Sequence, residues 1–208
     1  MSGWDEYWDR PRGAYDRIAA MYRRRVIRPQ LARVISRHFA AGSRLLHAGC
    51  GSGEVDAGIS KAMSIVGVDL SMSALRRYRS HTAGSRLCNG NILSLPFRDG
   101  SLDGVYNLGV VEHMTEREIV AAFREMHRVI RSGGEIVIFW PHRRASSVFV
   151  LRLIHRFRST PLYPPEISLL RSKSEARRIL NDAGFDLVDY EFGPRDGFVQ
   201  AVVVGSRR

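Results

Sequence analysis

The chain has 208 residues, of which 44% are hydrophobic, and a formal net charge of +11. That is enough apolar sequence for the core of one domain, and no apolar run approaches the ~20 residues that a membrane span needs. Cys50 and Cys88 are the only cysteines, too few for a disulfide framework and without metal-ligand spacing. No charged-then-apolar leader opens the sequence, so we expect a single cytoplasmic domain over residues 1–208.

Strand and helix patterns alternate along the chain. Strands are predicted at 44–48, 65–69, 85–88, 102–108 and 134–140, and helices near 53–62, 72–80 and 115–131. Gly133-Gly134 predicts a cap that ends the third helix. A helical stretch at 145–157 and a helix at 172–183 precede strands at 186–191 and 198–204. The turn residues between these last two strands predict an antiparallel hairpin, and the alternation as a whole predicts a doubly wound, mostly parallel α/β sheet.

A glycine-rich turn follows the first predicted strand, in the stretch Leu45-Leu-His-Ala-Gly-Cys-Gly-Ser-Gly53, and Asp69 ends the next strand. Alternating glycines let the backbone turn sharply and approach a ligand closely. A carboxylate at the end of the second strand can accept two hydrogen bonds from a ribose diol. Glu54, at the start of the predicted helix, would repel a pyrophosphate. The turn therefore predicts a ligand with a ribose and no phosphate at this position.

Five segments in order resemble the class I S-adenosylmethionine-dependent methyltransferases, with the nearest likeness to the small type 11 group. They are His47–Gly53, Gly67–Ser71, Asn89–Phe97, Leu102–His113 and Val129–Ile138. The resemblance covers roughly residues 15–204. It implies a Rossmann-like sheet of seven strands in the order 3-2-1-4-5-7-6, with strand seven antiparallel. It also implies S-adenosylmethionine as cofactor and S-adenosylhomocysteine as product.

The resemblance assigns a cofactor site outside the carboxyl ends of the first and fourth strands. Gly49, Cys50 and Gly51 would supply backbone contacts to the methionine moiety. Asp69 would bind the ribose and Leu70 would pack on the adenine. The remaining assigned positions are Asn91 and Ile92 at the adenine, and Asn107, Leu108 and Gly109 facing the sulfonium and the acceptor. From the residues alone, Asp69 can also be a helix cap and Asn91 a turn residue.

His47 departs from the family, which usually has an acid there that helps to hold the cofactor's ammonium. A neutral imidazole still forms hydrogen bonds but carries no charge, so we expect Glu54 or the N-terminal segment to compensate. Residues 13–22 resemble the helix that caps the cofactor in this family, with Tyr15 and Tyr22 as contacts. We expect residues 1–40 to form this helical cap and residues 142–171 to form an acceptor-side insertion or lid.

Positive charge is concentrated in two segments. Residues 10–37 contain nine arginines and one acid, and residues 142–180 contain nine basic residues and two acids. Together they carry +15, which leaves −4 for the rest of the chain. This separation favours an anionic partner, whether a small acceptor, a membrane or a nucleic acid. Residues 146–157 place an apolar helical face beside Arg152 and Arg156, which suits either an interfacial helix or a lid packed on the domain.

Nucleic acid is the less favoured partner, because the loop Asn107-Leu-Gly-Val lacks the Pro-Pro-aromatic sequence common in enzymes that methylate base amines. His113 and His142 are candidate general bases, although a histidine that opens a helix is also a common cap or packing residue. Glu112-His113 resembles the Glu-His pair of quinone-biosynthesis O-methyltransferases, some of which use a divalent ion; we predict no metal site. The leading hypothesis is O-methylation of a small or lipid-linked, anionic acceptor, with peripheral contact to an anionic membrane. The alternatives are an RNA methyltransferase and a cofactor-binding scaffold without catalysis.

Overall fold

A computed structural model describes residues 3–208 except 12, 83–85, 147, 149–165 and 195–196. Seven strands form one sheet in the order β3-β2-β1-β4-β5-β7-β6. The strands are β1 (Arg44–Ala48), β2 (Ser64–Asp69), β3 (Arg86–Asn89), β4 (Leu102–Leu108), β5 (Ile130–Trp140), β6 (Phe185–Glu191) and β7 (Ala201–Arg207). β7 pairs antiparallel with both β5 and β6, and the other pairs are parallel. The predicted sheet order and the antiparallel strand are thereby confirmed.

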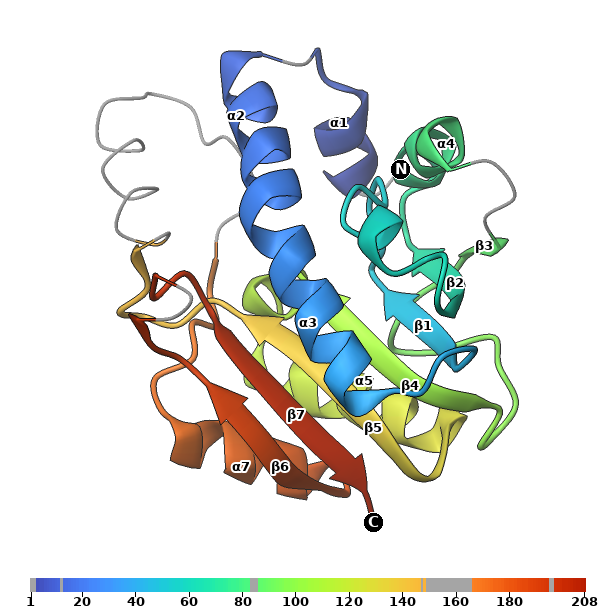
Figure 1. Cartoon of the computed structure of the whole chain (residues 1–208), viewed down its shortest axis with the longest axis vertical. Coiled ribbons are helices and arrows are strands. Elements are labelled where there is room, and N and C mark those ends of the chain that lie inside the picture. The colour runs from blue at the N-terminus through green and yellow to red at the C-terminus, as the bar shows by residue number, and fades with distance from the viewer. Residues whose placement is uncertain (1–2, 12, 83–85, 147, 149–165, 195–196) are drawn as a thin grey trace.

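Helices cover the sheet on both faces (Figure 1). The helices are α1 (Gly3–Asp9), α2 (Ala14–Tyr22), α3 (Arg28–His38), α4 (Met72–His81), α5 (Glu116–Val129) and α7 (Lys173–Asp182). A five-residue π-helix, η1 (Arg23–Ile27), joins α2 to α3 without a break. α3 crosses one face of the sheet, and α5 and α7 lie on the other. The start of α5 follows from its capping box, in which Thr115 and Glu118 satisfy each other's backbone N–H groups.

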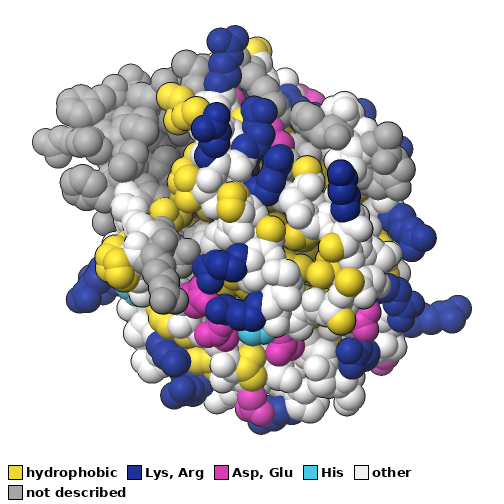
Figure 2. Space-filling view, in the orientation of Figure 1, with side chains coloured by type: hydrophobic (Ala, Val, Ile, Leu, Met, Phe, Trp, Pro, Cys, Tyr) yellow, Lys and Arg dark blue, Asp and Glu magenta, His cyan; other side chains and the backbone are white. Residues whose placement is uncertain are grey.

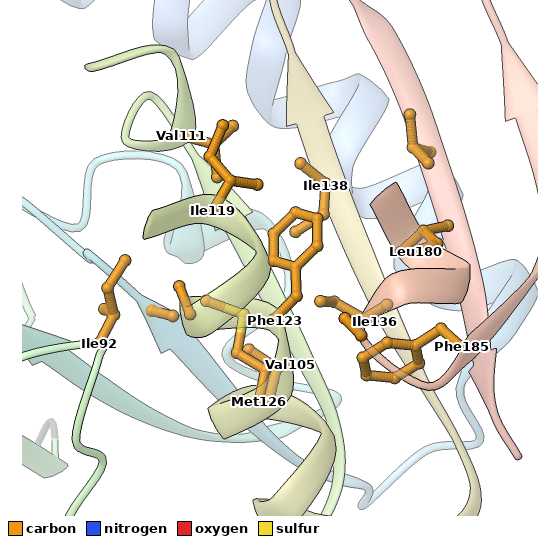
Figure 3. Close-up of a cluster of buried hydrophobic side chains, with 14 of the residues drawn as sticks. Ile92, Val105, Val111, Ile119, Phe123, Met126, Ile136, Ile138, Leu180 and Phe185 are labelled. Carbon is orange, nitrogen blue, oxygen red and sulfur yellow. The ribbon is translucent and has the colours of Figure 1, made fainter. Parts of the chain in front are cut away.

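Side chains alternate between the two faces of the central strands, as β geometry requires. On the face of α5, Phe123 and Met126 pack against Val105 and Ile136 in the larger buried cluster, which Figure 3 shows. The opposite cluster joins α3 to β1, β4 and β5 and includes Leu31, Leu45, Tyr106 and Phe139. Along β1, therefore, Leu45 and His47 face α3, whereas Leu46 and Ala48 face α5.

The predicted helix over 53–62 is wrong. Only a single 3-10 turn, η2 (Asp56–Gly58), forms there. Gly53 takes a positive φ of 66° and a Cβ on it would collide with the Tyr78 ring, so the chain turns instead of starting a helix. Asp56 then turns its side chain inward to bind Tyr78 and Tyr106. These tertiary hydrogen bonds replace the helical ones that the local pattern favours.

The predicted cap at Gly133-Gly134 is also wrong. α5 ends at Val129, and both glycines lie inside β5, which begins at Ile130. A positive φ at Gly133 and a register shift between Leu102 and Gly104 accommodate them as an irregularity in the strand. Most of the predicted helical stretch at 145–157, and much of the lid predicted at 142–171, lie outside the described residues. Within the part of the chain that is described, no helix is long and apolar enough to cross a membrane.

Candidate functional site

The glycine turn after β1 has the conformation that its residues predict. Gly49, Gly51 and Gly53 take φ values of +73°, +52° and +66°, a region that disfavours residues with a Cβ. The N–H groups of Gly49 and Cys50 both donate to the carbonyl of Val68, which ties the turn to β2. The turn therefore lies at the carboxyl edge of the sheet, between the ends of β2 and β4.

Asp69 ends β2 and holds this turn in place. One carboxylate oxygen accepts a hydrogen bond from Gly51 N at 2.8 Å, and the other accepts one from Ser71 N at 2.8 Å. Burial raises the pKa of the Asp69 carboxyl despite these two bonds. Each oxygen keeps a further lone pair for a ligand hydroxyl. Leu70, which follows, is 48% exposed and offers an apolar surface beside the carboxylate.

Asn107 reaches the same edge from the end of β4. Its side chain is fully buried, and Nδ2 donates to the carbonyl of Ala48 at 2.6 Å. Oδ1 is buried and has no hydrogen-bond partner in the described structure. A buried acceptor without a donor is costly, so this oxygen suits a ligand that brings an N–H, as the ammonium of S-adenosylmethionine would. Leu108 and Gly109 follow it, half-buried and exposed respectively.

Asn91 and Ile92 lie in the turn after β3. Asn91 is exposed, and its Oδ1 accepts a hydrogen bond from Leu93 N at 3.0 Å. This is the turn-residue arrangement that the sequence left open. Ile92 is buried in the larger core cluster. Contact of either residue with an adenine stays a prediction.

A buried polar network lies directly beneath the glycine turn. His47 Nδ1 is 2.9 Å from Asp56 Oδ2, and Asp56 also accepts hydrogen bonds from the hydroxyls of Tyr78 (2.6 Å) and Tyr106 (2.8 Å). His47 stacks on the Tyr106 ring, with 4.5 Å between centroids. Sequence reasoning missed Asp56 because nothing in its local pattern marks it as buried. The Glu54 carboxylate pairs with Arg23 at 2.8 Å, and its expected compensation for the acid missing at position 47 stays a prediction.

The short helix α1 lies across the glycine turn. A Cβ on Gly51 would stand 3.0 Å from the Trp8 ring, and Trp4 meets His113 edge-on with 5.1 Å between ring centroids. Asp5 accepts a hydrogen bond from the hydroxyl of Ser71, the N-cap of α4, at 2.6 Å. α1 thus spans the ends of β1, β2 and β4, and its aromatic residues cover the predicted cofactor position.

The two predicted tyrosine contacts lie farther along the N-terminal segment. Tyr22 is half-buried and packs against the core cluster under α3, and burial raises its pKa to about 12. The side chain of Tyr15 lies outside what the structure describes. Contact of these tyrosines with the cofactor stays a prediction, and Trp8, whose ring lies against Gly51, is an additional candidate contact.

The two candidate general bases, His142 and His113, differ in their surroundings. His142 is buried, its Nδ1 accepts from Arg144 N at 3.1 Å, and its Nε2 lies 3.0 Å from the carbonyl of Arg171. Burial lowers its pKa, and neither ring nitrogen is left to take a substrate proton. This geometry favours a structural role for His142. His113 is half-buried, in the short 3-10 turn η3 (Val111–His113) after β4.

Glu112 is a further candidate that sequence reasoning mentioned only beside His113. The side chain is buried, and its Oε2 has no hydrogen-bond partner among the described groups. Burial raises its pKa to about 8, with a smaller contribution from the charge of Glu166. Its backbone carbonyl accepts from Ile167 N and Ser168 N, which joins η3 to the chain that follows residue 165. In the described chain, no three His, Cys, Asp or Glu side chains gather as they would around a metal ion.

The protein is an α/β fold whose mostly parallel sheet has a glycine turn and a buried aspartate at its carboxyl edge, which is where such folds bind nucleosides. The type 11 family model, described as a methyltransferase domain, matches residues 46–138. A probable S-adenosylmethionine-dependent methyltransferase of Mycolicibacterium smegmatis is 31% identical over 153 residues, which is 73% of this chain and 55% of that protein. The chain belongs to the S-adenosylmethionine-dependent methyltransferases, and S-adenosylmethionine is its cofactor.

Other relatives differ in their named acceptors. An O-methyltransferase of Aspergillus nomiae is 26% identical over 88% of this chain and 80% of its own length. A tRNA (carboxymethyluridine(34)-5-O)-methyltransferase of Xenopus tropicalis is 33% identical over 47% of this chain and 15% of its own. The chain thus spans about half or less of the first curated relatives that it matches. The crystal structure of magnesium protoporphyrin IX methyltransferase from Synechocystis shares the fold, with a TM-score of 0.70 at 14% identity over 99% of this chain and 93% of that one.

Proposed function

We propose that this protein transfers a methyl group to an oxygen atom of a small or lipid-linked, anionic acceptor. The observation that carries the proposal is the outer surface of α2 and η1. Ile18 and Met21 are 60% and 55% exposed there, beside the exposed Arg17, Arg24 and Arg25. Figure 2 shows the dark blue side chains gathered with yellow ones over this helical run. Large apolar side chains exposed among arginines are typical of a helix that rests in an anionic membrane interface.

The residues after β4 suit transfer to a hydroxyl. The cofactor supplies the methyl group on its sulfonium, and the protein must align the acceptor oxygen with it. In this proposal His113 takes the hydroxyl proton as the oxygen forms its bond to the methyl carbon and the carbon–sulfur bond breaks. Glu112, with a pKa of about 8, is largely protonated at neutral pH and donates a hydrogen bond to the acceptor. The Aspergillus nomiae O-methyltransferase, matched over 80% of its length, supports oxygen as the methylated atom.

Radiolabelled methyl transfer tests the proposal. The protein is incubated with methyl-labelled S-adenosylmethionine and an extract, which is then separated into lipid, RNA, protein and small-molecule fractions. We expect label in the lipid or the anionic small-molecule fraction, in a linkage with the stability of a methyl ether or ester, and strongly reduced transfer by the Asp69→Ala variant at low cofactor concentration. Label in protein, or in a methylamine linkage, contradicts the proposal.

RNA methylation is the second candidate. The same arginines favour it, as does the similarity to the Xenopus tropicalis tRNA enzyme. Label in the RNA fraction, together with RNA binding that weakens steeply with salt, would select this function. A scaffold without catalysis is the third reading, because α1 covers the glycine turn. Tight cofactor binding with no label in any fraction would select it.

A further inference from the structure

A cavity of about 340 Å³ lies between the helical run α2–η1–α3 and the turn that follows Gly53. This volume is within the range of small-molecule sites. Arg17, Arg24 and Arg28 line it from the helices, and Glu54 and Ala57 line it from the turn. None of the residues assigned to the ribose, the adenine or the sulfonium of the cofactor lines the cavity, and the Glu54 carboxylate in its wall is paired with Arg23, so we treat it as a separate site. The turn η2, which stands where a helix was expected at 53–62, supplies Ala57 to its wall.

The acids in the cavity wall are already neutralised by arginines that lie outside it. Asp16 pairs with Arg10 at 2.9 Å, and Glu54 pairs with Arg23 at 2.8 Å. In the described chain, by contrast, Arg17, Arg24 and Arg28 have no carboxylate partner. Three guanidinium groups that share one cavity repel one another, and a bound anion relieves that repulsion.

The guanidinium groups that line the cavity keep N–H donors for a ligand. Arg28 donates through Nε and Nη2 to the backbone carbonyl of Glu54, at 3.1 and 2.5 Å. Arg24 Nε makes a long contact of 3.4 Å to the carbonyl of Ala20. Because a guanidinium has five N–H donors, each group keeps several for a ligand.

The backbone of the α2–η1–α3 run brings the three arginines to the same cavity. Arg17, Ala20 and Arg24, spaced by three and four residues, lie on one helical face, and Ala20 leaves room between the two arginines. η1 then inserts a π-turn, in which Arg28 N donates to the carbonyl of Arg23, five residues earlier. Such turns are frequent at functional sites. A Cβ on Gly58 would approach Arg28 Cγ to 2.8 Å. The glycine therefore allows the aliphatic part of the Arg28 side chain to pack closely against η2.

We propose that this cavity binds a phosphate group. Planar guanidinium forks match the oxygens of a phosphate, and Arg28, already held by two hydrogen bonds to the Glu54 carbonyl, loses little entropy on binding it. The group can belong to a soluble phosphate compound or to a phospholipid headgroup, since both present the same oxygens. The inference goes beyond the proposed function, because a phosphate site can be filled whether or not its ligand is the methyl acceptor.

Titration with inorganic phosphate, followed by ³¹P NMR, tests the site on the full chain. We expect saturable binding that weakens on the order of tenfold for each arginine removed in Arg24→Gln and in Arg17→Gln/Arg24→Gln. Arg25→Gln is the matched control, because it removes an exposed arginine of the same η1 segment that does not line the cavity. Arg28→Gln is informative only if its unfolding midpoint is unchanged, since Arg28 also anchors Glu54. Cofactor affinity, measured by calorimetry, should stay the same in the Arg17→Gln/Arg24→Gln variant.

Several results overturn the proposal. One is the absence of phosphate binding by the parent protein. Another is a loss of phosphate affinity in Arg25→Gln that equals the loss in Arg24→Gln. The third is a loss of cofactor affinity in Arg17→Gln/Arg24→Gln that parallels its loss of phosphate affinity. Vesicles of phosphatidic acid in phosphatidylcholine identify the source of the phosphate. Vesicle binding that free phosphate displaces assigns a headgroup, and phosphate binding without vesicle binding assigns a soluble ligand. A short RNA that binds with equal sensitivity to Arg24→Gln and Arg25→Gln indicates general charge attraction, which contradicts a built site. None of these measurements requires turnover, so they stand apart from the test of methyl transfer.

Discussion

The imidazole of His47 and the carboxylate of Asp56 form a buried pair, with 2.9 Å between Nδ1 and Oδ2. A proton on Nδ1, donated to Asp56, leaves Nε2 of a neutral imidazole as an acceptor. The acid that the first strand lacks at position 47 is thus present in the fold nine residues later. Asp56 places a carboxyl group beneath the glycine turn, and its contact with Nδ1 orients the imidazole ring.

Replacement of Asp56 tests how much this network stabilises the protein. Asp56→Ala leaves His47, Tyr78 and Tyr106 buried without their common acceptor. We expect the free energy of unfolding to fall by about 3–5 kcal/mol, because three buried donors lose their hydrogen-bond acceptor at once. Urea denaturation measures the loss. Asp186→Ala, which removes an exposed carboxylate on β6, is the control and should change stability by less than ~0.5 kcal/mol. Equal effects of the two changes would refute a structural role for the network.

Glu112 predicts a pH dependence of stability. Its pKa of about 8 in the folded protein lies above its ordinary value of 4.5. The folded state therefore keeps a proton that the unfolded chain releases as pH rises from 4.5 to 8. The stability from this group is fully present below pH 4.5 and is lost as pH rises through about 8, by about 5 kcal/mol in all. Glu112→Gln should flatten this part of the profile, whereas Glu6→Gln, an exposed carboxylate on α1, should not. Parallel profiles for the parent and Glu112→Gln would show that Glu112 does not titrate in this range.

Asp69→Ala tests the ribose assignment. Loss of two charge-assisted hydrogen bonds should weaken S-adenosylmethionine binding by roughly 2–3 kcal/mol. Part of that loss comes from the turn itself, because Asp69 also accepts from Gly51 N and Ser71 N. Asp69→Asn keeps one carbonyl acceptor and should lose less. Calorimetry gives both affinities, and an unchanged value in Asp69→Ala would remove the central assignment of the site.

Substitutions at two glycines with positive φ distinguish the effect of backbone strain from the effect of blocking the ligand. Gly42→Ala meets no atom within 4 Å and adds only conformational strain, about 1–2 kcal/mol. Gly51→Val adds comparable strain and also projects toward the Trp8 ring and the predicted cofactor. We expect both variants to lose stability in denaturation, and only Gly51→Val to lose cofactor affinity by more than about tenfold. If Gly42→Ala weakens cofactor binding as much, the effect comes from stability alone.

The strands were predictable from the sequence because their signals are local and repeated, whereas their order in the sheet came from the resemblance to the methyltransferase family. Each strand is a short apolar run with a turn beside it, and Asp69 follows its run at the position that the sheet edge requires. The same local reasoning failed at 53–62, where the pattern is helical but the outcome depends on Tyr78 and Tyr106. These residues lie 22 and 50 positions beyond Asp56. A hydrogen bond between such distant positions leaves no trace in a local window.

The contacts of α1 with the site could not be predicted from local sequence patterns either. Asp5, Trp4 and Trp8 stand in a segment without apolar periodicity, yet they reach Ser71, His113 and Gly51. Only the folded chain brings these groups together. The raised pKa of Glu112 likewise depends on burial by neighbours far along the chain, and position alone does not distinguish it from an exposed acid.

The apolar surface of α2 gives a direct test of membrane contact. Ile18→Ser/Met21→Ser removes two exposed apolar side chains and leaves every arginine in place. Insertion of each into an interface contributes roughly 1.5 kcal/mol or more, so we expect binding to anionic vesicles to fall on the order of 100-fold. Val188→Ser, on the exposed edge strand β6, is the control and should bind as the parent does. Co-sedimentation at two salt concentrations separates the contributions, because the arginine contribution weakens with salt and the apolar one does not. If the double variant sediments as well as the parent, the arginines alone recruit the acceptor, and contact with lipid chains through α2 is wrong.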